Sequence, residues 1–401
     1  MTTSPALDLA EAQKRLLGRI SPLGSERLPL SDALGRYLAE PVMAVRTQPP
    51  ADLSAMDGYA MRAGDFVGPW NVVGESAAGH PYLGELAMGE TIRISTGALL
   101  PRKAGAILLQ EDADRRGDTL STLNGEVATA RHIRRAGFDF EDGDTLLSNG
   151  HLLNAQRIAL IMAGGLSQVA VHHLPKIAIM ETGDELSADP GNCTKHQIPA
   201  SNGTMIAALA RPLTSQIDLI GPVADDPAAL SEALGKVEDV DILVTCGGAS
   251  VGDHDLVRPA LEAWGAKIDF WRVAIKPGKP IMVARRGRQL ILGLPGNPVS
   301  GYVTAFLFLL PVLRAMAGAK QCLPQSVMMP LRGKMPVGGQ RLELQRGRLV
   351  NGHAEPLHQQ DSSALAALSQ SDLLILGPRH GPARTSGAMV ECYQLQNGGI
   401  A

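Results

Sequence analysis

The sequence predicts a multidomain fold of α/β plus β structure, built around a central doubly wound, mostly parallel α/β domain. Between residues 176 and 294, apolar β-rich runs alternate with helical patterns, which is typical of such a sheet. Between residues 70 and 112, short β-like runs are separated by Gly and Pro, which predicts an inserted β module. The 401 residues exceed the usual size of one hydrophobic core, so several domains are expected.

The first part of the chain is predicted to be a helical lead-in that the β module interrupts. Helical patterns occur at residues 6–20 and 31–40, and a proline ends the second pattern. A third helix is expected at 153–165, where two glycines provide a stop signal. The strands expected in the β module are 70–76, 90–96 and 104–112.

The central α/β domain comes next, and Gly-punctuated β runs after about residue 325 predict a small C-terminal β-domain. The strands expected in the α/β domain are 176–180, 216–223, 240–248 and 288–294. The helices expected beside them are 201–210, 227–237, 256–265 and 298–318. The expected domains are 1–44 with 140–174 (helical linker), 45–139 (inserted β-rich), 175–325 (α/β) and 326–401 (C-terminal β).

Composition and charge argue against several classes of protein. The net charge of −3 carries no nucleic-acid signature. The most apolar run, 302–313, is shorter than a membrane span and contains a proline, so we expect no membrane partner and a cytoplasmic location. Four widely spaced cysteines without a CxxC pair indicate reduced thiols.

The stretch ILGLPGNPVSGY, Ile291 to Tyr302, places two glycines and two prolines between an expected strand and an expected helix. Gly allows close approaches, and Pro298 suits the first turn of a helix, where its missing N–H is not needed. Free backbone N–H groups at a helix start beside a Gly-rich turn favour a phosphate or another oxyanion.

Charged residues gather at the expected strand ends, where open parallel sheets bind their ligands. Acids follow the first three strands of the α/β domain, and two lysines precede the fourth. These residues are Asp184, Glu185, Asp225, Asp226, Asp253, Asp255, Lys276 and Lys279. Carboxylates with lysines and Gly-rich N–H donors fit a nucleotide or anhydride phosphate with Mg²⁺.

Several of these residues also have a structural interpretation, and Lys276 and Lys279 beside the Pro-Gly turn could be solvated charges. Asp184 suits a turn, and Asp225 and Asp226 precede a proline, where Asp commonly caps a helix. Cys246 fits a small core residue better than a nucleophile, and His254 has no second histidine at ligand spacing. The combination over four loops favours a ligand site over these local roles.

Six motifs occur in order along the chain: SAMDGYA, ISTGALLP, TGDEL, GGASVGDHD, AIKPGKP and GLPGNPVS. In this order and spacing the chain resembles the molybdopterin molybdenumtransferases, the enzymes of the last step of molybdenum-cofactor synthesis. The E domain of gephyrin is their eukaryotic relative. The resemblance runs from the N-terminal helices to the C-terminal β-domain.

The resemblance implies a specific activity. Adenylylated molybdopterin and molybdate would be the substrates, AMP would be released, and Mg²⁺ would assist. It also implies an elongated homodimer whose active cleft uses both subunits, and it makes the adenylyltransferase of the same pathway a candidate partner. Molybdate and tungstate have the same charge and nearly the same shape, so both remain open.

The family's functional residues can be carried over by motif. The resemblance implies catalytic roles for Asp57, Thr96, Glu185, Asp225, Asp255, Pro295 and Pro298, with Gly97 beside Thr96 and Asp139 in the RRAGFDF segment. It implies substrate contacts for Gly247, Gly248, Ser250, Lys276, Lys279, Gly296, Asn297, Arg346 and Ser362. Glu185 and Asp255 are the expected metal ligands. Glu181 stands where a small residue is common, and Ala249 lies inside GGASVG.

Two rival functions remain at this point. The α/β domain could adenylylate molybdopterin with ATP, as its shorter relatives do, although the β module and the MDGYA segment argue against this. The protein could instead be a non-catalytic scaffold, as the gephyrin resemblance suggests, although the intact set of acids favours an enzyme.

Overall fold

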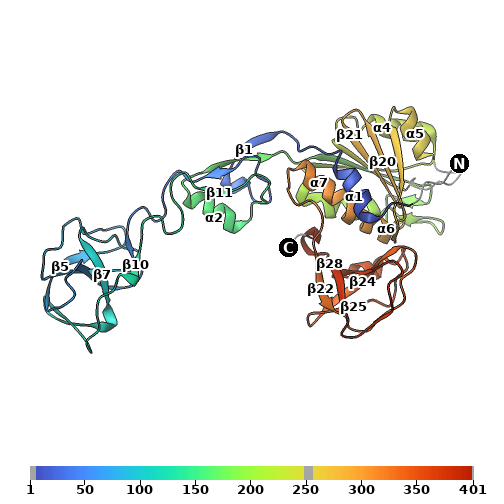
Figure 1. The fold of residues 1–401 in the computed structure, drawn as a ribbon. Coiled ribbons are helices and arrows are strands. Elements are labelled where there is room, and N and C mark those ends of the chain that lie inside the picture. The colour runs from blue at the N-terminus through green and yellow to red at the C-terminus, as the bar shows by residue number, and fades with distance from the viewer. Residues whose placement is uncertain (1–5, 248–255, 400–401) are drawn as a thin grey trace.

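The computed structural model describes residues 6–247 and 256–399. Figure 1 shows an elongated molecule with a β module at one end and a central sheet with its helices at the other. A slender segment carrying β1, β11 and α2 joins them, and the C-terminal β strands lie beside the central domain. Mixed α/β and β structure along the chain confirms the predicted fold class, whereas the domain boundaries given above stay a prediction.

The central sheet has six strands in the order β16-β13-β17-β21-β20-β18. The pairs within the first four strands are parallel, and β20 and β18 are antiparallel additions at one edge. The bounds are β13 Lys176–Thr182, β16 Gln216–Val223, β17 Ile242–Cys246, β18 Lys267–Arg272, β20 Pro280–Arg286 and β21 Gln289–Leu294. The alternating pattern predicted the four parallel strands, but it did not predict the β18–β20 edge, which lacks helical crossovers.

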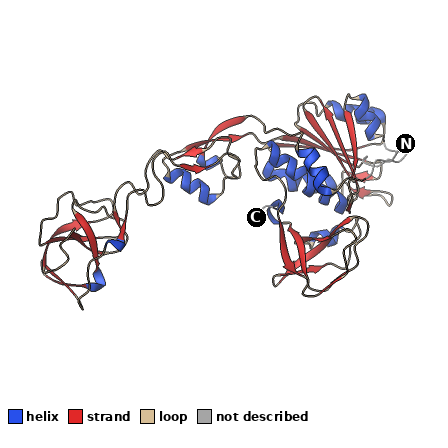
Figure 2. Ribbon diagram, viewed as in Figure 1, coloured by secondary structure: helices blue, strands red, loops and turns tan. Residues whose placement is uncertain are grey.

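Helices cover both faces of this sheet (Figure 2). Strand β13 shows why, because Ile177 and Ile179 enter one hydrophobic core while Ala178 and Met180 enter the other. One face packs against α1, α3 and the α6–α7 run, and the other packs against α4 and α5. The bounds are α1 Leu9–Leu17, α3 Asn202–Ala210, α4 Pro227–Gly235, α5 Val257–Ala263, α6 Pro298–Thr304 and α7 Leu310–Met316.

A continuous helical run spans Pro298–Met316, with a π-helical segment, Ala305–Leu309, between α6 and α7. Within the described residues it is the one helix long and apolar enough to cross a membrane by length and composition. The shorter run expected to be too short for a membrane span, 302–313, lies inside this helix. However, 89% of its most apolar window is buried inside the protein, so core packing accounts for the apolar composition.

The predicted helix at 31–40 was wrong. The structure has only a short 3₁₀ turn at Leu30–Asp32, after which Tyr37 and Leu38 form isolated bridges to Leu152 and Val171. Gly35 adopts a φ of +77°, which breaks the helical path. Pairing with distant strands therefore replaces the local helix.

Two short antiparallel pairs and one helix build the slender segment. Strand β1 (Ser25–Pro29) pairs with β12 (Gln168–His172), and β2 (Val42–Met43) pairs with β11 (Thr145–Leu147). Helix α2, Ala155–Ala163, confirms the helix expected at 153–165.

The β module contains a six-stranded sheet in the order β7-β4-β6-β5-β9-β8. Its strands are β4 Gly58–Arg62, β5 Trp70–Ser76, β6 Glu90–Ile94, β7 Ala104–Leu109, β8 Ala113–Arg116 and β9 Thr119–Thr122. The small pair β3 (Leu53–Ser54) and β10 (Ile133–Arg134) lies beside it. The three strands expected here are confirmed as β5, β6 and β7.

The C-terminal sheet has the order β19-β24-β26-β28-β22, with β25 on β24. Its strands are β19 Ile275–Lys276, β22 Ser326–Pro330, β24 Leu342–Val350, β25 His353–Pro356, β26 Leu373–Gly377 and β28 Met389–Gln394. Because β19 belongs to the AIKPGKP loop of the central domain, this pairing fixes that loop against the C-terminal sheet. The remaining short elements are β14 Leu186–Ser187, β15 Ile198–Pro199, β23 Lys334–Met335, β27 Arg384–Thr385 and α8 Leu365–Ser369.

Candidate functional site

A pocket of about 600 Å³ lies at the carboxyl ends of β13, β17 and β21, where the sequence predicts phosphate binding. We call it the glycine-turn pocket. Its lining includes six predicted residues: Glu185, Gly247, Pro295, Gly296, Asn297 and Pro298. The structure therefore brings the TGDEL loop and the GLPGNP turn to one place.

Glycine is required where these loops approach each other. Gly247 has a φ of +99°, and a Cβ added there would lie 3.2 Å from the Thr182 carbonyl oxygen. Asn297 precedes α6 without making a side-chain cap, and Pro298 is the first helical residue, as expected. Pro298 has no N–H, and the Val299 N–H that follows it donates to the Ser362 carbonyl, so the first turn of α6 is already partly engaged.

Further carboxylates lie next to the Glu185 loop, but Asp184, Asp225 and Asp226 are outside the lining of the pocket. The Asp225 N–H donates to Asp184 Oδ1 at 3.1 Å. Burial, together with the negative charges of Asp184 and Glu185, raises the pKa of Asp225. Asp226 has the local role considered above, since its Oδ2 accepts from the Ala229 N–H at 2.9 Å and caps α4.

The second expected metal ligand, Asp255, lies outside the described residues, as do Gly248, Ser250, Asp253 and His254. Across residues 6–247 and 256–399, no three His, Cys, Asp or Glu side chains gather closely enough to hold a metal ion by themselves. The described acids therefore supply part of a metal site at most.

Glu181 also lines the glycine-turn pocket, and it is only 8% exposed. Its Oε1 accepts from the Asn202 N–H at 3.1 Å, at the start of α3. Burial raises the pKa of this carboxyl, and the backbone hydrogen bonds from Gly203 and Asn202 oppose that shift. The sequence marked Glu181 as unusual but held no signal for this contact, because residues 181 and 202 meet only in the folded sheet.

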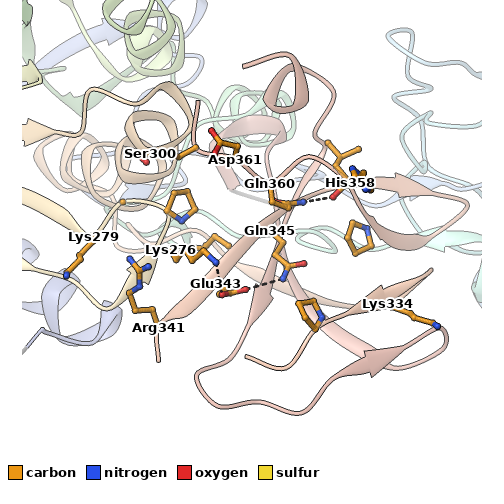
Figure 3. A pocket seen from close by; sticks show the side chains of 17 residues that line it. Lys276, Lys279, Ser300, Lys334, Arg341, Glu343, Gln345, His358, Gln360 and Asp361 are labelled. Atoms are coloured by element: carbon orange, nitrogen blue, oxygen red, sulfur yellow. Dashed lines mark hydrogen bonds and ion pairs between the residues drawn. The ribbon is translucent and has the colours of Figure 1, made fainter. Parts of the chain in front are cut away.

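A second cavity, of about 790 Å³, lies between the AIKPGKP loop and the C-terminal sheet (Figure 3). We call it the basic cavity. Three predicted residues line it, namely Lys276, Lys279 and Ser362. Sequence reasoning missed its other charged or titratable lining residues, which are Lys334, Arg341, Glu343, His358 and Asp361.

Lys276 and Lys279 differ in their surroundings. The Lys276 ammonium lies 3.2 Å from Glu343 Oε1, as the dashed line in Figure 3 shows. Lys279 is exposed and forms no ion pair within the described part of the chain. The cavity therefore offers one paired and one unpaired ammonium group to an anion.

Arg346 lies outside the lining of the basic cavity. It is fully buried, and its Nη2 donates to the carbonyl oxygens of Gln359 at 2.8 Å and Asp361 at 3.0 Å. Burial lowers the pKa of its guanidinium. In this placement the side chain holds the loop that carries Ser362, and the expected contact with the anion stays a prediction.

Ser362 joins the two cavities. Asn297 Nδ2 donates to Ser362 Oγ at 3.2 Å, and the Val299 N–H donates to the Ser362 carbonyl at 3.0 Å. Ser362 lines the basic cavity, while its neighbour Ser363 lines the glycine-turn pocket. The predicted phosphate and oxyanion sites are thus adjacent.

Asp57 and Thr96 meet in the β module, at the other end of the molecule (Figure 1). Asp57 Oδ1 accepts from the Thr96 N–H at 2.6 Å and from the Thr96 hydroxyl at 2.9 Å. These hydrogen bonds lower the pKa of Asp57. Gly97, with a φ of +80°, completes the turn, and Asp139 donates its N–H to the Gln48 carbonyl at 3.0 Å. Within one chain, this pair lies at the opposite end of the molecule from the domains that line the two cavities.

Comparison with known proteins decides the family. Three family models match in order: the MoeA N-terminal region (domain I and II) at 7–165, the probable molybdopterin binding domain at 178–315, and the MoeA C-terminal region (domain IV) at 329–395. A molybdopterin molybdenumtransferase of Nostoc is 34% identical over 389 residues, covering 92% of this chain and 89% of the relative. The chain belongs to the molybdopterin molybdenumtransferase family. The family member of the same name from Haemophilus influenzae is 32% identical over 348 residues, 85% of each chain.

The fold of the family also matches. A crystal structure of the molybdopterin biosynthesis moeA protein from Pyrococcus horikoshii aligns with a TM-score of 0.83 at 28% identity, covering 97% of this chain and 99% of that one. The resemblance inferred from six short motifs is therefore confirmed over nearly the whole length.

Proposed function

We propose that this protein is a molybdopterin molybdenumtransferase, which converts adenylylated molybdopterin and molybdate to molybdenum cofactor and AMP. The observation that carries the proposal is the adjacency of two unlike cavities. One has a Gly-rich turn and carboxylates, and the other has lysines. A substrate with a phosphoanhydride fits the first, and a tetrahedral dianion fits the second.

The glycine-turn pocket would bind the anhydride. The Gly247 N–H already donates to the Leu294 carbonyl at 3.1 Å, so the backbone around Gly296 would stabilise the charge that develops when an incoming oxygen cleaves the P–O bond and AMP leaves. Bound Mg²⁺ would neutralise charge on the phosphate oxygens. Glu185 and Asp255 are the residues we expect to hold it, and the raised pKa of Asp225 supports this, since crowded carboxylates favour a nearby cation.

The basic cavity would bind molybdate. Lys276 and Lys279 would supply charge-assisted contacts, and Ser362 would supply a hydroxyl between the two substrates. Released from AMP, the pterin dithiolene would then meet molybdate across the Ser362 junction. Arg346 would hold that loop.

We further infer that the active form is a cytoplasmic homodimer. The exposed Asp57–Thr96 pair lies in a β module far from both cavities of its own chain (Figure 1). A two-fold dimer of elongated chains could place this pair at the glycine-turn pocket of the second copy. A reaction that adenylylates molybdopterin must supply the substrate, so an adenylyltransferase is the partner enzyme that we expect.

A turnover assay tests the proposal. Purified protein with adenylylated molybdopterin, molybdate and Mg²⁺ should release AMP and yield molybdenum-loaded pterin, and Mg²⁺ chelation should slow both. Protein that bound these substrates without releasing AMP would be a scaffold. Accumulation of adenylylated pterin from ATP and metal-free molybdopterin would instead identify an adenylyltransferase.

A further inference from the structure

We propose that Glu343 is a built-in competitor for the oxyanion at Lys276, and that it sets how tightly the basic cavity holds its ligand. This inference rests on the proposed function, which places molybdate in that cavity. It concerns a carboxylate that neither the motifs nor the family resemblance singled out.

The pairing of Glu343 with Lys276 is built into the sheet. Strands β19 and β24 run parallel, and Lys276 lies opposite Glu343 in their register. The Lys276 ammonium is 3.2 Å from Glu343 Oε1, and Gln345 Nε2 donates to Glu343 Oε2 at 3.3 Å. Both carboxylate oxygens of Glu343 therefore have a partner within the C-terminal sheet or the loop beside it.

The two side chains differ in their freedom to move away. Lys276 is 57% exposed at its side chain, whereas Glu343 is only 17% exposed. Lys276 has a long flexible stem, so it can turn toward an anion in the cavity. Glu343 is held by the sheet and by Gln345, so its negative charge stays at the cavity wall.

The other acid of the cavity is differently engaged. Asp361 Oδ1 accepts from the Ser363 N–H at 2.8 Å and from the Ser363 hydroxyl at 2.6 Å. Lys279, Lys334 and Arg341 form no ion pair within the described residues. Glu343 therefore acts on one ammonium group in particular, and an entering anion must share Lys276 with it.

This arrangement predicts an unusual effect of mutation. Glu343→Gln keeps the shape of the side chain and frees the Lys276 ammonium, so molybdate should bind more tightly. A partly exposed ion pair contributes up to about 1 kcal/mol, which corresponds to a change of up to about fivefold in the dissociation constant. Glu355→Gln is the matched control, because Glu355 pairs with Arg332 at 2.8 Å and lies outside the cavity lining.

The experiment is a calorimetric titration of molybdate alone into the full-length chain. The variants are wild type, Glu343→Gln, Lys276→Gln and the double variant. Competition through Lys276 predicts that Glu343→Gln tightens binding in the wild-type background and has less than about a twofold effect when Lys276 is already Gln. Equal tightening in both backgrounds, or none in either, would overturn the proposal.

Two further variants keep the outcome clear. Should Glu343→Gln fail to fold, Glu343→Asp retracts the carboxylate by one methylene and should give a smaller tightening in the same direction. Lys279→Gln reports on the proposed function itself. If it leaves molybdate binding unchanged, the cavity is not the molybdate site. If it weakens binding while Glu343→Gln does not tighten it, only the role of Glu343 fails.

Discussion

Glu181 occupies a backbone N–H at the glycine-turn pocket that an anion could otherwise use. A free helix start attracts anions, and α3 begins at the glycine-turn pocket. The Glu181 carboxylate already accepts the Asn202 N–H there, and the Ser362 carbonyl accepts the Val299 N–H at the start of α6. The Gly247 N–H also has a partner, the Leu294 carbonyl, so we expect a substrate phosphate to use the backbone around Gly296.

The same residue predicts a pH dependence of stability. Burial raises the pKa of Glu181 above its ordinary value of 4.5, so the folded protein holds a proton that the unfolded chain has already lost. Stability from this group is therefore complete at low pH and is lost as pH rises through the folded pKa. Glu181→Gln should gain stability relative to wild type between acidic and neutral pH.

Urea unfolding at several pH values measures this difference. The control is Glu232→Gln, because the hydrogen bond from Lys236 lowers the pKa of Glu232, so this variant should change in the opposite direction with pH. A Glu181→Gln variant that weakens relative to wild type as pH rises would contradict the buried-carboxyl account.

Lys279 carries the most direct prediction for the basic cavity. Losing one charge-assisted contact costs about 1.5–3 kcal/mol, so Lys279→Gln should raise the half-saturating molybdate concentration roughly ten- to a hundredfold. The affinity for adenylylated pterin should change much less. Titration of molybdate at fixed pterin substrate measures the first quantity, and titration of the pterin substrate at fixed molybdate measures the second. Weakened pterin binding with unchanged molybdate dependence would assign Lys279 to the phosphates.

The motifs predicted some site residues far better than others. Asp57 lies in the motif SAMDGYA and Thr96 in the motif ISTGALLP, and the two side chains are hydrogen-bonded in the structure. Lys334, Arg341 and His358 lie in weakly patterned segments and enter the cavity only because the C-terminal sheet docks on β19. Nothing local in the sequence reports that docking.

At the level of helices and strands, the sequence predicted those elements whose hydrophobic pattern continues over eight or nine residues. The segments around α2 and β16 were expected within a few residues of their observed bounds. The expected helix at 31–40 failed because Tyr37 and Leu38 pair with distant residues, an interaction that no local pattern can show. The edge strand β18 was not predicted, because it is followed by another strand, β20, and not by a helix, so the strand–helix alternation does not extend to it.

The helical run Pro298–Met316 should be a central stabilising element. Phe306 is fully buried in it, and its ring centroid lies 5.9 Å from that of Tyr393 in β28. Phe306→Ala should reduce the free energy of unfolding by about 3–5 kcal/mol. Phe138→Ala is the control, because Phe138 is 75% exposed and its loss should hardly matter. Equal unfolding midpoints for the two variants in urea would contradict a core role.

The elongated shape of the chain separates residues that the proposed reaction needs together. Asp57 and Thr96 lie in the β module, while the two cavities lie at the opposite end of the molecule (Figure 1). The sequence motifs predicted all of these residues as one site. They could not show how far apart the residues lie, because spacing along the sequence does not determine distance in the fold. If they act together, each reaction centre must combine two chains.

Mixing two inactive variants tests that claim directly. Asp57→Asn removes a carboxylate of the β module, and Lys279→Gln weakens molybdate binding in the basic cavity, so each homodimer should have low turnover when molybdate is near the wild-type half-saturating concentration. When dimers re-form at random, a mixed dimer contains one undamaged centre, and roughly a quarter of wild-type AMP release should return. If the mixture stays as inactive as its parts while both variants fold and exchange subunits, the centre lies within one chain and the two-chain account is wrong.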